Sequence, residues 1–144
     1  MQNFRNLFQD ENLSFTYSRK WRDESDGSSL KKLVFVENKL QNILTVNRYF
    51  NKNKLPMGNF LDRTEINFRK NGWNILKSEI ISISGADSVI IITSAFDVHN
   101  EEFNQYVTFL FYNEFMYVFE LITFPKSKNT IEEYNNVINS IVFV

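Results

Sequence analysis

The most reactive side chains of the sequence lie in an acidic stretch around its only histidine. Residues 97–102 read Asp-Val-His-Asn-Glu-Glu, so Asp97, His99, Glu101 and Glu102 place three carboxylates and one imidazole within six residues. Such groups could bind a divalent cation or exchange protons with a substrate. The stretch lacks the i, i+4 ligand spacing of helical zinc sites, and acidic turns between strands are common. We therefore expect a solvated turn and leave open whether it binds a metal ion.

Other signatures of catalysis are missing from the sequence. The chain has no cysteine and one histidine, which excludes disulfides, thiolate nucleophiles and metal centres built from several histidines. Ser84-Gly85 does not fit the Gly-x-Ser-x-Gly nucleophile motif, and four glycines provide no phosphate-binding loop. Glu132 and Glu133 fit the first turn of a helix, where carboxylates offset the helix dipole. We therefore expect no catalytic residue, no cofactor and no metal ligand, and a protein that is not an enzyme.

Charge is divided unequally along the chain. Residues 1–72 contain 13 basic and 8 acidic residues, net +5, whereas residues 73–144 contain 3 and 9, net −6, which together give the total of −1. A basic patch on and before a predicted helix could meet nucleic acid or an acidic partner. Its residues are Lys52, Lys54, Arg63, Arg69 and Lys70. The pI near 5.9 and the lack of an aromatic-basic RNA motif favour a solvated helix face without nucleic acid.

The elements that position these residues are mostly strands. The first two of the predicted strands form a hairpin, and the last four form an antiparallel meander because only short turns, such as residues 85–87, separate them. A polar loop over residues 19–29 carries Trp21, which we expect to anchor it in the core. The predicted strands cover residues 4–8, 13–17, 33–37, 43–50, 75–83, 89–96, 105–112 and 115–124, and residues 37–39 supply a turn.

Two segments have the three- and four-residue spacing of helices. Residues 59–71 follow this period, with Asn59 as the expected cap and Gly72 as the stop. Residues 130–140 open with a capping box from Thr130 to Glu133. Both alternating faces of the last three strands are apolar, so we expect the two helices to cover opposite faces of the sheet. The fold class is α+β, with an antiparallel sheet of about seven or eight strands.

Two helices of about three turns cannot cover both faces of such a sheet. Some aromatic side chains should therefore stay exposed, where they could contact a partner. The leading hypothesis is a non-enzymatic binding module, a chaperone or adaptor for another protein, with a homodimer as a further possibility. The alternative is a pocket for a small ligand or lipid. The candidate contact residues are Phe50, Phe96, Tyr106, Tyr112, Tyr117 and Phe124. Each of these side chains could instead belong to the core, which is the more common place for an aromatic residue.

The sequence also predicts where the protein is located. The longest apolar-rich run, residues 115–124, is about half the roughly 20 residues that a membrane helix needs. The first residues lack the apolar core of a signal peptide and a cysteine for lipid attachment. We expect a cytoplasmic protein without a membrane span, or an exported lipoprotein-type protein if a leader has been removed.

Both ends of the chain resemble the PsbP-like superfamily, which includes DcrB-type proteins. Residues 13–21, Leu-Ser-Phe-Thr-Tyr-Ser-Arg-Lys-Trp, are similar to the strand, turn and tryptophan that open these domains. Residues 115–125, a helix and then residues 139–143 are similar to their end. The resemblance implies a single domain over residues 1–144, an α/β/α sandwich, and binding or assembly roles without shared catalytic residues.

A second similarity concerns one branch of that superfamily. Residues 43–48, Ile-Leu-Thr-Val-Asn-Arg, and residues 59–63, Asn-Phe-Leu-Asp-Arg, are similar to an apolar strand ending in arginine and a helix of the Eag-type chaperones. These cytoplasmic chaperones hold the transmembrane segments of secreted effectors. The resemblance therefore implies an effector protein as the partner.

Overall fold

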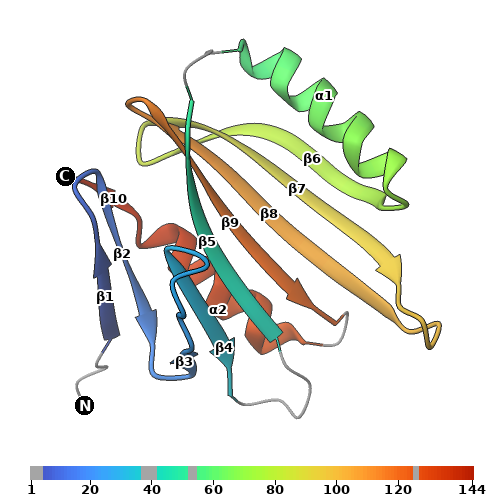
Figure 1. Ribbon diagram of the computed structural model, residues 1–144, viewed down its shortest axis with the longest axis horizontal. Helices are drawn as coiled ribbons and strands as arrows, with labels where there is room; N and C mark the ends of the chain where they lie inside the picture. Colours follow the sequence, from blue (N-terminus) through green and yellow to red (C-terminus); the bar gives the residue numbers. More distant parts are fainter. Residues whose placement is uncertain (1–4, 37–41, 52–54, 125–126) are drawn as a thin grey trace.

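Two antiparallel sheets and two helices make up the computed structural model, which describes residues 5–36, 42–51, 55–124 and 127–144 (Figure 1). The larger sheet has seven strands in the order β3-β4-β5-β9-β8-β7-β6, and the smaller has the order β1-β2-β10. The strands are β1 (Arg5–Gln9), β2 (Leu13–Ser18), β3 (Trp21–Asp23), β4 (Lys31–Phe35), β5 (Asn42–Phe50), β6 (Asn74–Ile83), β7 (Ala86–Phe96), β8 (Glu102–Tyr112), β9 (Phe115–Thr123) and β10 (Val142–Phe143), and the helices are α1 (Met57–Lys70) and α2 (Lys128–Asn139).

The meander of four consecutive strands confirms the predicted α+β fold class. β6, β7, β8 and β9 pair in sequence order, each antiparallel to the next. The turn between β6 and β7 is Ser84-Gly85, and both residues have positive φ, 51° and 87°. Such a tight turn suits the right-handed twist of a hairpin. The prediction of a turn at residues 85–87 was therefore wrong by two residues, since Ala86 and Asp87 already belong to β7.

The two helices cover opposite faces of the large sheet, as the apolar strands predicted. The ring of Phe60 in α1 lies 5.1 Å from Phe109 and 4.9 Å from Phe111. The ring of Tyr134 in α2 lies 6.1 Å from Tyr106. Because alternate residues of a strand point to opposite faces, these contacts place α1 and α2 on either side of β8. We call the two sides the α1 face and the α2 face.

The small sheet packs on the α2 face, beside α2 (Figure 1). Phe15 of β2 contacts Phe119 of β9 at 5.4 Å, and Phe143 of β10 stacks on Tyr112 of β8 at 4.0 Å. The hairpin of β1 and β2 was predicted, but its place in a separate sheet was not. The α2 face is thus covered by both a helix and a sheet, and the main core lies beneath them.

The predicted loop over residues 19–29 contains a short strand. β3 pairs with β4, with Trp21 opposite Phe35, and the two rings meet edge to face at 5.1 Å. The Trp21 side chain is 2% exposed. Arg22 and Asp23 of β3 are polar and exposed, and only Trp21 is buried, so the sequence pattern did not indicate a strand. The turn expected at residues 37–39 lies outside the described residues.

Both helices begin two residues before the predicted positions. α1 starts at Met57 after Pro56, so Asn59 is not its cap. α2 starts at Lys128, and Thr130 lies inside it, fully buried, where its hydroxyl accepts a hydrogen bond from Asn42 Nδ2 at 3.0 Å. This contact with β5 occupies the Thr130 side chain, so the predicted capping box does not form. Glu132 and Glu133 accordingly fall outside the first turn.

Candidate functional site

The cover on the α2 face is uneven, which leaves one part of the sheet accessible. In β9, Tyr117, Phe119 and Leu121 point to this face and are fully buried. In β7, Ile90 and Ile92 point to the same face but are only half-buried. The small sheet and α2 therefore cover the part of the α2 face around β9 better than the part around β7.

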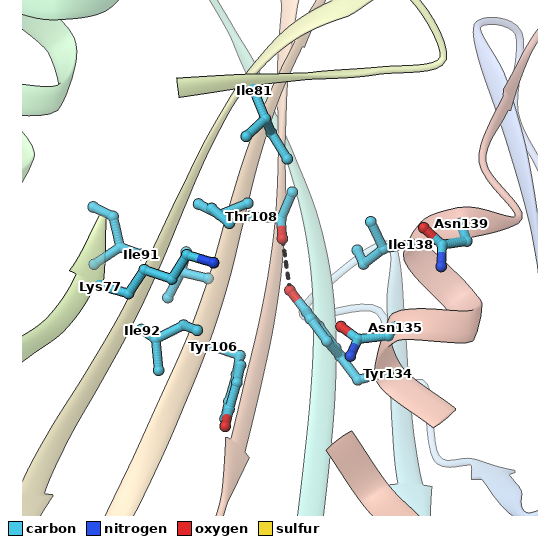
Figure 2. Close-up of a pocket in the computed structure, with 12 residues that line it drawn as sticks. Lys77, Ile81, Ile91, Ile92, Tyr106, Thr108, Tyr134, Asn135, Ile138 and Asn139 are labelled. Carbon is cyan, nitrogen blue, oxygen red and sulfur yellow. Dashed lines mark hydrogen bonds between the residues drawn. The ribbon is translucent and has the colours of Figure 1, made fainter. Parts of the chain in front are cut away.

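The accessible part forms a pocket of about 290 Å³ between α2 and strands β6, β7 and β8, which we call the α2 groove. Figure 2 shows its two sides: Ile81, Ile92 and Tyr106 lie on the sheet, and Tyr134 and Ile138 project from α2. Its size and mainly apolar walls match the general description of binding pockets. The groove is the candidate functional site of the described residues.

Tyr134 fixes one wall of the groove. Its side chain is 3% exposed, and its hydroxyl lies 2.8 Å from Thr108 Oγ1 and donates to the carbonyl oxygen of Phe119 at 3.3 Å. Burial raises the pKa of the Tyr134 phenol well above its ordinary value, because charge is disfavoured in the interior. Tyr134 is therefore uncharged at neutral pH, and its hydroxyl holds α2 to the sheet.

Polar groups lie at the rim of the groove. Asn135 and Asn139 are exposed on α2, and Lys77 extends from β6, where its ammonium group pairs with Glu79 at 3.5 Å (Figure 2). Burial also raises the pKa of the half-buried Tyr106. Among the described lining residues, none carries the carboxylate, imidazole or serine hydroxyl of a nucleophile–base pair. The arrangement suits binding of an apolar group whose polar end reaches the rim.

Three of the predicted contact residues are exposed or line the groove. Tyr106 lines it directly. Phe96, 64% exposed, ends β7 and points to the α2 face like Ile92. Phe50, 60% exposed, ends β5, and its ring lies 6.0 Å from Phe115. Since β5 and β7 are separated in the sheet by β9 and β8, these residues do not form one patch.

The other three predicted contact residues are less accessible. Tyr112 is half-buried under Phe143, and Phe124 is half-buried just after β9. Tyr117 is fully buried, so assigning it to a partner surface was wrong. The alternating aromatic pattern of β9 could not show this burial, because the small sheet that covers Tyr117 comes from both ends of the chain.

Tyr117 belongs instead to a polar network that joins the two sheets. Its hydroxyl donates to Asp10 Oδ2 at 2.6 Å and accepts from Asn12 Nδ2 at 3.2 Å. The Arg48 guanidinium lies 3.2 Å from the same Asp10 oxygen and 2.7 Å from Glu11 Oε1. This network satisfies polar groups between the β1–β2 turn and the strands β5 and β9.

Hydrogen bonds to the Asp97 side chain hold the turn that contains His99. Asp97 Oδ1 accepts hydrogen bonds from the backbone N–H groups of His99 at 2.8 Å and Glu101 at 2.9 Å, and the His99 side chain is exposed. Asn100 adopts φ 63°. Across the described ranges, no three His, Cys, Asp or Glu side chains gather to hold a metal ion. Asp97 thus forms the turn, and the absence of metal there remains a prediction.

The predicted basic patch is only partly described. Arg63, Arg69 and Lys70 are exposed on α1, where Arg69 pairs with Glu65 at 3.5 Å, one helical turn earlier. Lys52 and Lys54 lie outside the described residues. In the described segments, no helix is both long and apolar enough to cross a membrane.

No protein-family model and no curated protein matches the chain. Several solved structures, however, are similar to it. LpqN of Mycobacterium tuberculosis, described as involved in cell envelope biogenesis, has a TM-score of 0.75 and 10% identity, with 98% of this chain and 91% of that chain covered. Cyanobacterial PsbP (CyanoP) of Synechocystis sp. PCC 6803 has a TM-score of 0.73 and 13% identity, with 100% and 95% covered.

A third similar structure is the protein of unknown function PA94 of Pseudomonas aeruginosa. It has a TM-score of 0.64 and 15% identity, with 96% of each chain covered. At these identities the likeness establishes the fold and nothing further. The chain has a PsbP-like α+β fold, as the resemblance at its two ends implied.

Proposed function

We propose that the protein is a non-catalytic module that binds an apolar segment of another protein in the α2 groove, as a chaperone or adaptor. The observation that carries this proposal is the groove itself. Ile90, Ile92 and Tyr106 remain accessible there, although Tyr117, Phe119 and Leu121 on the same face of β9 are fully buried. Burial of such apolar surface is the main favourable contribution to most protein association.

A polypeptide suits this surface for two reasons. Phe96 lies four residues beyond Ile92 on the same face of β7, with Ser94 between them, so an occupant longer than a small molecule could also contact this exposed ring. The amides of Asn135 and Asn139 at the rim can both donate to and accept from a peptide backbone. The Eag-type resemblance implies a secreted effector as the client, bound in the cytoplasm.

A second candidate function is binding of a small amphipathic ligand or a lipid. The pocket volume of about 290 Å³ is close to that of small-molecule sites, and Lys77 offers a positive charge at the rim. LpqN, which shares the fold, is described as involved in cell envelope biogenesis. The experiment below distinguishes the two candidates.

Native mass spectrometry of the protein purified from its own host provides the test. We expect the wild-type protein to retain a polypeptide, and Ile92→Asp to lose it because a carboxylate would enter the groove wall. The matched control is Ile66→Asp, which places the same charge on an isoleucine that is 56% exposed on α1. A retained small molecule in place of a polypeptide would favour the second candidate. Equal retention by folded Ile92→Asp and Ile66→Asp would contradict both.

A further inference from the structure

The two walls of the α2 groove are held in different ways. Tyr134 anchors α2, which forms one wall, through buried hydrogen bonds to the sheet. The outer wall is β6, the last strand in the sheet order, which contributes Lys77 and Ile81. Among the described residues, β6 makes its main contacts with β7 and with α1. The position of this outer wall therefore depends on α1.

The part of the chain that forms α1 and most of β6 contains no buried side chain. Over residues 55–82, every side chain is half-buried or exposed, and Ile83 is the first buried residue after them. By contrast, α2 buries Thr130, Tyr134, Val137 and Ile138. Parts of a protein with few buried contacts open at a lower free-energy cost than its core. We call residues 57–78, which comprise α1, the turn after it and the first half of β6, the flap.

The two parts of the flap are joined to each other. Ser78 Oγ of β6 donates a hydrogen bond to Glu65 Oε1 of α1 at 2.5 Å. The ring of Phe68 in α1 lies 6.3 Å from that of Trp73, which directly precedes β6. A bulge in this half of β6 interrupts its pairing with β7. We therefore expect α1 and the first half of β6 to move together.

Aromatic contacts hold the flap against the sheet, where α1 lies beside β6 (Figure 1). The Phe60 ring packs edge to face on Phe109 and Phe111 of β8. The Trp73 ring packs in the same way on Phe103 at 5.3 Å. The main core of the described residues includes no residue of the flap. Breaking these half-buried contacts should therefore cost less free energy than unfolding the core.

A polypeptide segment needs more room than the closed groove provides. The groove volume of about 290 Å³ is at the lower end of the roughly 300–1,000 Å³ of sites for drug-sized ligands. We propose that the flap opens as a unit and moves Lys77 away from Ile92, its partner in β7, which widens the groove and admits the segment. The end of β6 stays in place, because Ile81 packs on the main core and Ile83 belongs to it. This inference rests on the proposed function and adds how the segment enters.

Amide hydrogen exchange of the protein without a client tests whether the flap opens as a unit. In the wild type, α1 and residues 74–78 should exchange at least about a hundredfold faster than β8. Phe60→Ala should accelerate exchange throughout the flap by one common factor of about ten, and leave α2 and β8 unchanged. Ile66→Ala, at an exposed position of α1, is the control and should change nothing. Wild-type exchange of the flap as slow as that of β8, or acceleration of α1 alone, would overturn the proposal.

A thiol in the groove tests whether this opening widens it. Because the chain has no cysteine, Ile92→Cys introduces a single thiol, and fluorescein-5-maleimide serves as a bulky probe. Adding Phe60→Ala should raise the labelling rate of Ile92→Cys by the factor measured for residues 74–78. Leu7→Cys, exposed on β1, is the control and should be labelled at a rate that Phe60→Ala does not change. An unchanged rate at Ile92→Cys would overturn the proposal. Since no client is present, such a failure would leave the proposed function to its own test by mass spectrometry.

Discussion

The hydroxyl of Tyr134 lies 2.8 Å from Thr108 Oγ1, and this contact joins α2 to β8 where the two form the α2 groove. Both residues are buried, at 3% and 2% exposure. The same phenol donates to the Phe119 carbonyl oxygen, so one side chain holds the helix to two strands. The position of α2, and with it the open side of the groove, depends on this buried contact.

Removing that hydroxyl should destabilise the protein. Tyr134→Phe leaves the Thr108 hydroxyl and the Phe119 carbonyl without their partner, which should lower the free energy of unfolding by about 1–3 kcal/mol. Urea denaturation measures the change. Tyr106→Phe is the control, because the Tyr106 hydroxyl makes no hydrogen bond to the described residues, and it should cost less than about 0.5 kcal/mol. Similar losses for both variants would contradict the role assigned to Tyr134.

Trp21 should contribute more than any exposed aromatic residue. Trp21→Ala removes a side chain that is 2% exposed and packs on Phe35, so it should lower the free energy of unfolding by about 3–5 kcal/mol. Phe96→Ala, at a side chain 64% exposed, should change it by less than about 1 kcal/mol. A loss below about 1 kcal/mol for Trp21→Ala would show that β3 is not held in the core.

Asp10 makes stability sensitive to acid. Burial acts to raise the pKa of its carboxyl, but hydrogen bonds from Tyr117 and from the backbone N–H groups of Leu13 and Asn12, together with the Arg48 charge, hold this pKa below its ordinary value. The stability gained is present above the unfolded-state pKa of about 3.9 and is lost as the pH falls below it toward the lowered folded-state pKa.

Denaturation by urea at pH 5 and pH 3 tests this coupling. Asp10→Asn should be less stable than the wild type at pH 5, but it should lose less stability between the two values, because the amide does not titrate. Asp62→Asn, at an exposed position on α1, serves as the control and should behave as the wild type does. If Asp10→Asn and the wild type lose equal stability between pH 5 and pH 3, the role of Asp10 is refuted.

His99 should be dispensable. Its side chain is exposed, and the turn is formed by Asp97 through backbone hydrogen bonds, so His99→Ala should change the free energy of unfolding by less than about 0.5 kcal/mol. Zinc should shift the melting temperature of neither protein. A metal-dependent rise that His99→Ala abolishes would instead reveal a site, because a ligand that binds the folded state stabilises it.

Much of the fold follows from local sequence patterns. Strands β6 to β9 were predicted because apolar runs alternate with short turns, and the apolar residues on both faces of β8 and β9 indicated that the sheet is covered on two sides. The predicted start of α2 was wrong because Thr130 matched a capping motif, whereas its side chain is buried against Asn42, 88 residues away in the chain. No pattern of neighbouring residues contains that contact.

The site was less predictable than the fold. Tyr106 was among the predicted contact residues, and it does line the groove. Ile90 and Ile92 were read only as part of an apolar strand, since nothing local shows that α2 and the small sheet leave this part of the face uncovered. Tyr117 illustrates the opposite error, because the small sheet that buries it, and the Asp10 and Asn12 side chains that bond its hydroxyl, lie far from it in the sequence.

Site-specific photocross-linking in the native host tests the central claim most directly. A photoreactive phenylalanine derivative at Tyr106 would lie in the α2 groove, and the same residue at Tyr49, 52% exposed on the α1 face, is the control. The account predicts one discrete polypeptide adduct from position 106 and none from position 49. Folded proteins that give no adduct at position 106, or the same adduct from both positions, would contradict the proposal that the α2 groove binds another protein.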